Sequence, residues 1–188
     1  GAEGVRHAFL AEREVELWPL SQTGQPLQEN GVAVAPDERH LTDVLVDEAV
    51  AWVEEHAAEP WLAVLSLQSP HIPLMATEAW LAEVPARESE EARLYDANLH
   101  GIDVAIGRLQ AALVALGLDE HTLLVFTSDH GCPEGPVACS NGGLRGGKLT
   151  AQEGGLRVPT FVRWPAMLGP AGVGAPVSHL DVLPTVVA

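Results

Sequence analysis

The chain has 188 residues, of which 47% are hydrophobic and 19% charged, a composition that predicts a folded domain with a buried core and excludes a disordered chain. Ten basic residues against 26 acidic ones give a formal net charge of −16, which excludes a nucleic-acid-binding surface and disfavours an anionic membrane surface. No apolar run approaches the roughly 20 residues that a membrane span needs. The only cysteines, Cys132 and Cys139, exclude a disulfide-rich scaffold and predict either one local bridge or two thiols.

Residues 1–40 are weakly patterned. Trp18-Pro19, Asn30-Gly31 and Pro36-Asp37 favour turns between short extended pieces, so we expect an irregular lead-in to the domain that residues 41–188 form. The sequence begins without Met and stops without a polar tail. We therefore expect an internal piece of a longer protein.

The regular patterns begin after this lead-in. Apolar residues at helical spacing predict a helix over residues 42–58, with Thr42 or Asp43 as its N-cap. Residues 90–116 carry the longest helical pattern, with Gly117 as its C-cap and a break near Gly101. Three short, almost wholly apolar runs predict strands, the first two of them buried on both faces; they cover residues 61–67, 122–128 and 156–164.

The strand, long helix and strand over residues 61–128 predict a right-handed crossover, hence a parallel sheet and the α/β class. The loop with His71 follows one of these strands, and Asp129-His130 follows the other. Both loops should then open at the same edge of the sheet, where open α/β sheets bind ligands. The long glycine-rich loop over residues 129–155 is of a length that is usually functional or disordered.

Taken singly, the polar motifs are ambiguous. Asp129-His130-Gly131 at a strand end can bind a hard cation, orient a histidine or simply cap backbone amides. A lone loop histidine such as His71 is more often structural or merely exposed. Asp103, on an apolar stretch of the long helix, is interpreted as a satisfied core carboxylate, and His179 as structural.

The spacing of residues from Gly142 to Lys148 nearly matches that of the phosphate-binding loop of nucleotide-binding proteins. Leu149 stands where that motif needs a magnesium-binding Ser or Thr, and the run does not follow a strand directly, which argues against nucleotide binding.

Six motifs follow one another in a fixed order along the chain, and the series resembles the type I sulfatases of the alkaline phosphatase superfamily over about residues 41–188. The resemblance implies that this stretch is the central-to-C-terminal part of a sulfatase catalytic domain. The implied fold is an incomplete, doubly wound and mostly parallel sheet flanked by helices. The motifs are Ser69-Pro70-His71-Ile72-Pro73-Leu74; Asp103 with Gly107-Arg108; Thr127-Ser128-Asp129-His130-Gly131; Leu144-Arg145-Gly146-Gly147-Lys148; Glu153-Gly154-Gly155-Leu156-Arg157-Val158-Pro159; and Asp181-Val182-Leu183-Pro184-Thr185.

The resemblance also implies an activity, the hydrolysis of a small-molecule or saccharide sulfate ester. In the family, a formylglycine hydrate attacks sulfur while a divalent cation, usually Ca²⁺, polarises the sulfate oxygens. By motif, Asp129 would be a metal ligand, and His130 would occupy the position of a second ligand that is often Asn. Lys148 would contact the sulfate and the leaving oxygen, and His71 would bind sulfate and protonate the leaving alcohol. Family habit adds a formylglycine-generating enzyme as a partner and a lysosomal, periplasmic or secreted location.

The departures from the family pattern concern the nucleophile. Neither Cys132-Pro133-Glu134 nor Cys139-Ser140-Asn141 matches the family's Cys/Ser-x-Pro-x-Arg motif. The nucleophile, a pair of aspartates and the motif's arginine are expected outside these residues, so we expect the chain alone to hydrolyse no sulfate ester and to bind calcium weakly. Two alternatives stay open: a phosphonate or phosphodiester hydrolase of the same superfamily, and a non-catalytic, degenerate fragment.

Overall fold

The structure is a computed structural model that describes residues 6–9, 28–30, 32–33, 39–135 and 138–187. Most of the predicted lead-in over residues 1–40 therefore lies outside the described residues. The elements are β1 (Arg6–Phe9), β2 (Gln28–Glu29), β3 (Val32–Ala33), α1 (Leu41–Glu55), β4 (Trp61–Val64), α2 (Glu78–Glu83), α3 (Glu90–Ala115), a 3-10 turn (Asp119–His121), β5 (Leu124–Thr127), α4 (Glu153–Leu156), β6 (Thr160–Arg163), a second 3-10 turn (His179–Asp181) and α5 (Val182–Val187).

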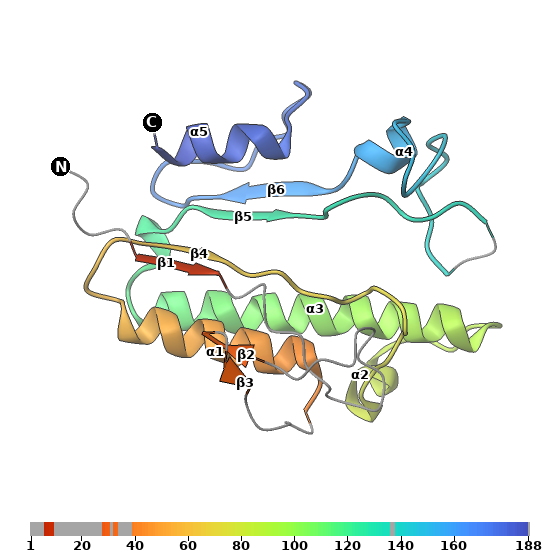
Figure 1. Cartoon of the computed structure of the whole chain (residues 1–188), viewed down its shortest axis with the longest axis horizontal. Coiled ribbons are helices and arrows are strands. Elements are labelled where there is room, and N and C mark those ends of the chain that lie inside the picture. The colour runs from red at the N-terminus through yellow and green to blue at the C-terminus, as the bar shows by residue number, and fades with distance from the viewer. Residues whose placement is uncertain (1–5, 10–27, 31, 34–38, 136–137, 188) are drawn as a thin grey trace.

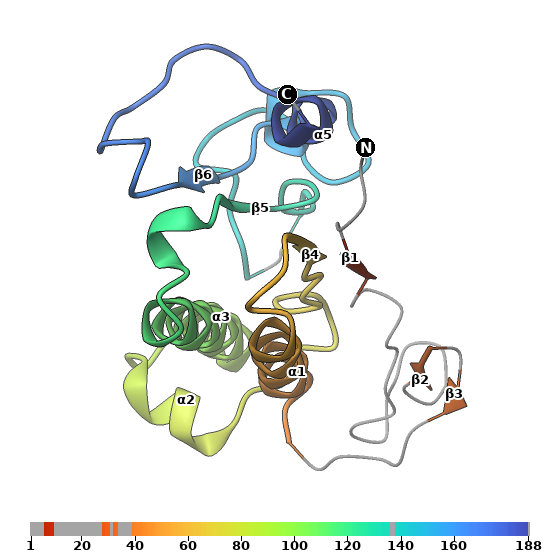
Figure 2. The same cartoon turned by 90° about the vertical axis from the view of Figure 1, so that its left-hand side faces the viewer.

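The elements form three layers (Figures 1 and 2). Helices α1, α2 and α3 lie on one side of a middle layer in which β6, β5, β4 and β1 succeed one another, and α5 lies on the other side. β4 and β5 run in the same direction, so the loops that follow them leave at the same end of the layer, as predicted (Figure 1). No helix in the described part of the chain is long and apolar enough to cross a membrane.

The strand pairing is less uniformly parallel than predicted. β1 pairs in parallel with β4, but β5 pairs antiparallel with β6, and β2 pairs antiparallel with β3. Between β5 and β6 the only helix in the described residues is the four-residue α4. A parallel neighbour needs a crossover that carries the chain back along the sheet, usually a helix. Without one, β6 returns directly beside β5.

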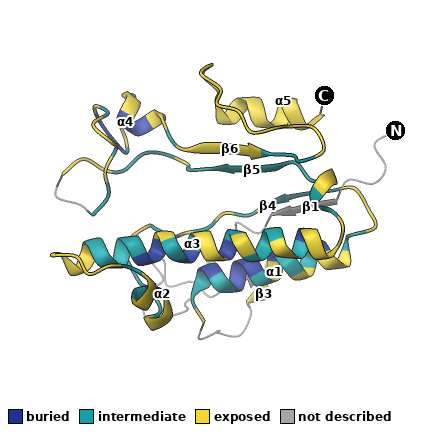
Figure 3. Cartoon of the chain, turned by 180° about the vertical axis from the view of Figure 1, so that it is seen from behind, coloured by how far each residue is buried: buried dark blue, intermediate teal, exposed yellow. Residues whose placement is uncertain are grey.

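The strands are also less buried than predicted. β4 is half-buried with Val64 exposed, β5 is half-buried throughout, and β6 exposes Thr160, Phe161 and Val162 (Figure 3). Among the residues described, the buried hydrophobic side chains lie on the helices instead, where α1 packs against α3. They are Val44, Leu45, Val46, Ala49, Val53, Trp80, Ala97, Ala105 and Leu113.

The long helix α3 follows its predicted range, with Gly117 at its end as predicted but without the predicted break near Gly101. It ends before Gly117, whose φ of +71° is the left-handed conformation that suits a glycine at a helix end. It continues without a break through Gly101, because Trp80 of α2 packs against that backbone and a side chain there would have no room. Asp103 is exposed, so its interpretation as a core carboxylate was wrong: it lies on the solvent-facing side of the helix, between the buried residues Gly101 and Ala105.

The start of α1 is capped by His40 rather than by Thr42 or Asp43. The Nδ1 atom of His40 accepts a hydrogen bond from the Thr42 backbone N–H (3.2 Å), and its Nε2 atom lies 3.2 Å from the Met75 carbonyl oxygen. Accepting at Nδ1 and donating at Nε2 requires the neutral imidazole. Burial lowers the pKa of His40, more than the Met75 hydrogen bond and the Asp43 charge raise it.

Substitutions at two glycines of α3 should have opposite effects. Gly101→Ala places a Cβ 2.5 Å from the Trp80 ring and should destabilise the protein by about 1–3 kcal/mol through overpacking. Gly107→Ala meets no atom within 4 Å and should stabilise it by about 0.5–1 kcal/mol, because alanine loses less backbone entropy in a helix. Urea unfolding measures both changes, and equal shifts of the two variants would contradict the packing of Trp80 on Gly101.

His40 should make stability depend on pH. Its pKa in the folded state is below the value of about 6.5 expected in the unfolded chain, so the unfolded state takes up the proton first as pH falls. The free energy of unfolding should therefore fall as pH drops from about 6.5 toward the lowered folded-state pKa. His40→Asn keeps an N-capping side chain that does not titrate, so urea unfolding at several pH values should show a flatter dependence. The same substitution at exposed His121 is the control and should leave the wild-type slope.

Candidate functional site

The loop that carries His71 is fixed to both core helices by a buried chain of polar side chains. Thr42 of α1 donates to the Ser69 hydroxyl (3.0 Å), which donates to the side-chain oxygen of Asn98 on α3 (3.1 Å). The Asn98 amide in turn donates to the Leu94 carbonyl (2.8 Å). Thr42 is 1% exposed and Asn98 2% exposed, so breaking this chain would leave buried polar groups without partners. Ser69 is thereby held two residues before His71.

His71 and Lys148, which are far apart in the sequence, meet in space. Lys148 Nζ lies 3.1 Å from His71 Nε2, and His71 Nδ1 lies 2.7 Å from the Ile72 carbonyl oxygen. A carbonyl only accepts, so Nδ1 carries a hydrogen, and Nε2 is then the acceptor for the ammonium group. The loop after β4 and the loop after β5 thus bring two basic side chains together at the end of the layer where both strands finish.

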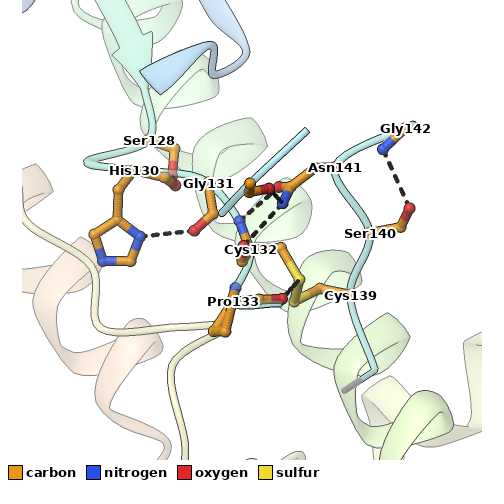
Figure 4. The surroundings of a disulfide bond; sticks show 10 residues. Ser128, His130, Gly131, Cys132, Pro133, Cys139, Ser140, Asn141 and Gly142 are labelled. Carbon is orange, nitrogen blue, oxygen red and sulfur yellow. Dashed lines mark hydrogen bonds between the residues drawn. A yellow bond between two sulfur atoms is a disulfide. The ribbon is translucent and has the colours of Figure 1, made fainter. Parts of the chain in front are cut away.

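Asp129 and His130 form a second pair directly after β5. Asp129 Oδ2 lies 3.2 Å from His130 Nε2, and Asp129 Oδ1 accepts from the His130 backbone N–H at 2.9 Å. The Asp129 side chain is 82% exposed, so a ligand can approach the pair from solvent. His130 Nδ1 lies 2.9 Å from the Gly131 carbonyl, which orients the ring (Figure 4).

This pair fits part of a cation site. Two ligand atoms of one ion lie about as far apart as these two do, given metal–ligand bonds of roughly 2.0–2.6 Å. No group of three or more metal-binding side chains occurs among the described residues, so Asp129 and His130 would supply only part of a coordination shell. The carboxylate suits Ca²⁺, whereas an imidazole nitrogen suits transition metals better.

A backbone contact connects the two pairs. The Lys148 backbone N–H donates to the Cys132 carbonyl oxygen at 3.1 Å, and Cys132 is two residues beyond His130. Lys148 therefore touches His71 with its side chain and the Asp129-His130 segment with its main chain. The four residues predicted from the sequence thus form two pairs that are linked through the backbone of Cys132, and their roles toward a substrate are proposals.

The glycine-rich loop is folded around groups that the sequence analysis did not single out. Cys132 and Cys139 form a disulfide, which the sequence left open (Figure 4). The Asn141 side chain bonds to both Cys132 and Gly146, and the Thr150 hydroxyl bonds to both backbone groups of Gly147. An Asn before a Gly-Gly turn reads as ordinary turn chemistry, and no local pattern signals that its amide reaches nine residues back.

Two comparisons with known proteins bear on the family. Residues 5–188 match the sequence model of the family described as Sulfatase. The chain belongs to the sulfatase family. It is 39% identical over 153 residues to arylsulfatase D of Homo sapiens and 41% identical over 154 residues to steryl-sulfatase of Mus musculus. These matches cover 77% and 78% of this chain but only 25% and 24% of those relatives, so the chain spans about a quarter of their length.

Solved structures also show the sulfatase fold. The chain superposes on Ps i-CgsB, solved in complex with k-i-k-neocarrahexaose, with a TM-score of 0.81 and 34% identity, covering 88% of this chain and 37% of that one. A structure described under the metabolism of multiple glycosaminoglycans by Bacteroides thetaiotaomicron gives a TM-score of 0.67 and 26% identity, covering 83% of this chain and 33% of that one. The sulfatase family typically uses Ca²⁺ and formylglycine.

Substituting the two candidate metal ligands should show whether the site prefers a cation that binds oxygen, such as Ca²⁺, or one that also binds nitrogen, such as Mn²⁺. In the full-length protein, Asp129→Asn should weaken the binding of both Ca²⁺ and Mn²⁺ by at least about tenfold, since even residues that merely support metal ligands contribute that much. His130→Asn replaces a nitrogen by an amide oxygen and should weaken Mn²⁺ binding more than Ca²⁺ binding. Calorimetric titration measures both, with Asp103→Asn on exposed α3 surface as the control. Unchanged affinities in both ligand variants would rule out this cation site.

Proposed function

We propose that this chain forms part of the active site of a sulfatase that hydrolyses a small-molecule or saccharide sulfate monoester. The contact between Lys148 and His71 carries the proposal. In this contact a lysine side chain lies beside an imidazole, at the end of the layer where two strands of the same direction finish. The names of the relatives refer to aryl and steryl sulfates, and one solved structure holds a saccharide. They support a sulfate ester as the substrate class without identifying the alcohol part of that ester.

In this proposal Lys148 binds the anion. A sulfate ester develops negative charge on its leaving oxygen as the S–O bond breaks, and a fixed ammonium group nearby lowers the energy of that state. Lysine acts as a point charge, so what matters is how close its ammonium group lies to the leaving oxygen; its contact with His71 puts that group beside the proposed acid.

His71 handles the proton of the leaving alcohol. The Ile72 carbonyl holds the Nδ1–H in both the neutral and the protonated ring, so the proton that His71 exchanges with substrate is the one at Nε2. An anion bound between the two side chains offsets the repulsion between the ammonium group and a protonated ring, and favours the charged form of the acid.

Asp129 and His130 would hold the divalent cation, together with ligands from outside the described residues. When bound, that cation supplies Lewis acidity toward the sulfate oxygens, and the family's formylglycine, made by a formylglycine-generating enzyme, supplies the nucleophile. Asp129 is accessible enough for this role, and its hydrogen bond from the His130 N–H fixes one carboxylate oxygen.

Removing either basic side chain should abolish most of the activity. In the full-length protein, Lys148→Ala and His71→Ala should each lower kcat on a chromogenic aryl sulfate by about 10²–10⁴-fold. Little stability should be lost, because His71 is exposed and Lys148 is only half-buried. Arg87→Ala, which removes a cation from a surface ion pair with Asp96, is the matched control and should keep wild-type rates.

The outcome also distinguishes the rival functions. A wild-type protein that turns over phosphate diesters or phosphonates faster than sulfate esters would identify a phosphoryl-ester hydrolase of the same superfamily. Near-normal rates in both variants would remove Lys148 and His71 from the mechanism.

A further inference from the structure

Asn141 lies near the middle of the glycine-rich loop. Both its side-chain oxygen and its side-chain nitrogen form hydrogen bonds. Its Oδ1 accepts from the Cys132 backbone N–H at 2.8 Å. Its Nδ2 donates to the carbonyl oxygens of Cys132 and Gly146, each at 2.9 Å. One side chain thus bonds both backbone groups of Cys132 (Figure 4). It also joins Cys132 to Gly146, in the loop segment that leads into Lys148.

The carbonyl of Cys132 connects Asn141 with the proposed active site. That oxygen accepts from the Asn141 amide and also from the backbone N–H of Lys148 at 3.1 Å. On the other side, Gly146 is two residues before Lys148. Asn141 therefore supports the backbone of Lys148 through two carbonyl groups, those of Cys132 and Gly146, and among the described residues it has no hydrogen bond to the Lys148 side chain or to His71.

The glycines around this amide show how closely the segments approach. A Cβ at Gly147 would collide with the Cys132 carbonyl and would lie 3.1 Å from Asn141 Nδ2. A Cβ at Gly131 would lie 2.9 Å from Asn141 Oδ1. The backbone segments fit around an amide of this size and shape, and a side chain of another length or polarity would displace them.

We propose that Asn141 is a positioning residue for Lys148, which sets where the ammonium group stands relative to His71. The proposal rests on the proposed function. Its physical basis is that a misplacement of about 1 Å at a reacting centre can lower the rate about 10²-fold, even when the change lies away from the chemistry. Without the Asn141 amide, the Cys132 carbonyl keeps Lys148 as a partner but loses the bonds that fix its own position.

The disulfide makes a variant at this position informative. Cys132 and Cys139 stay covalently joined when Asn141 is replaced, so the loop remains closed and the packing of α1 on α3 is untouched. Loss of the amide should then shift the placement of Lys148 without unfolding the protein.

The test compares Asn141→Ala and Asn141→Asp in the full-length protein, alone and combined with Lys148→Ala. Asn141→Ala should lower kcat on an aryl sulfate by about 10–100-fold with a smaller change in KM. In the Lys148→Ala background it should cost less than about twofold, because a residue that acts through Lys148 has nothing left to position. Asn141→Asp should be at least as impaired, since its carboxylate, although the same shape, faces two carbonyl oxygens.

Ser140→Ala is the matched control, because Ser140 is the preceding residue and its hydroxyl accepts from the Gly142 N–H, two residues along the same loop, rather than from the segment around Cys132. It should keep wild-type kcat. A loss of kcat in Asn141→Ala that is equally large with and without Lys148 would overturn the proposal, as would wild-type activity in Asn141→Asp.

A second readout does not depend on activity. Hydrogen exchange should quicken at the backbone amides of Cys132 and Lys148 in Asn141→Ala, while the amides of α3 keep their wild-type protection. If the wild-type protein hydrolyses no sulfate ester, the proposed function fails, and exchange alone then tests the positioning of Lys148. Unchanged exchange at Lys148 would overturn it.

Discussion

The proposed site depends on one constraint, that β4 and β5 run in the same direction within one layer. Their following loops leave at the same end, so His71 and Lys148 reach each other from distant parts of the sequence, with 3.1 Å between Nε2 and Nζ. If either strand were reversed, its loop would emerge at the opposite end of the layer and the two basic groups would be separated by the length of a strand.

Each partner of this contact is held by its own set of polar groups. On the His71 side, Asn98 and Thr42 fix Ser69 from within the helical core, where an unmade hydrogen bond costs a full desolvation penalty. On the Lys148 side, Asn141 and the disulfide organise a loop whose described residues include no buried hydrophobic side chain. Buried hydrogen bonds thus support His71 from the helical core, and amide hydrogen bonds with a disulfide support Lys148 within its loop.

The sheet and the helices contribute unequally to the core. The buried apolar side chains among the described residues lie where the helices meet, and β6 and α5 expose most of theirs. The two strands predicted from the sequence to be buried on both faces, β4 and β5, are only half-buried. Sequence pattern reports how apolar a strand is, whereas its burial depends on what packs against it.

The sequence by itself determined the helices over residues 42–58 and 90–116, the strands, the family and the four candidate residues. Helical periodicity and motif order are local properties, and they need no knowledge of distant contacts. Only the tertiary structure decided that His40 caps α1, that Cys132 bonds to Cys139, that β6 lies antiparallel to β5 and that Asn141 supports the backbone of Lys148. Each of these depends on contacts that no periodic pattern reports: the ring of His40, for example, lies against the Met75 carbonyl of another segment.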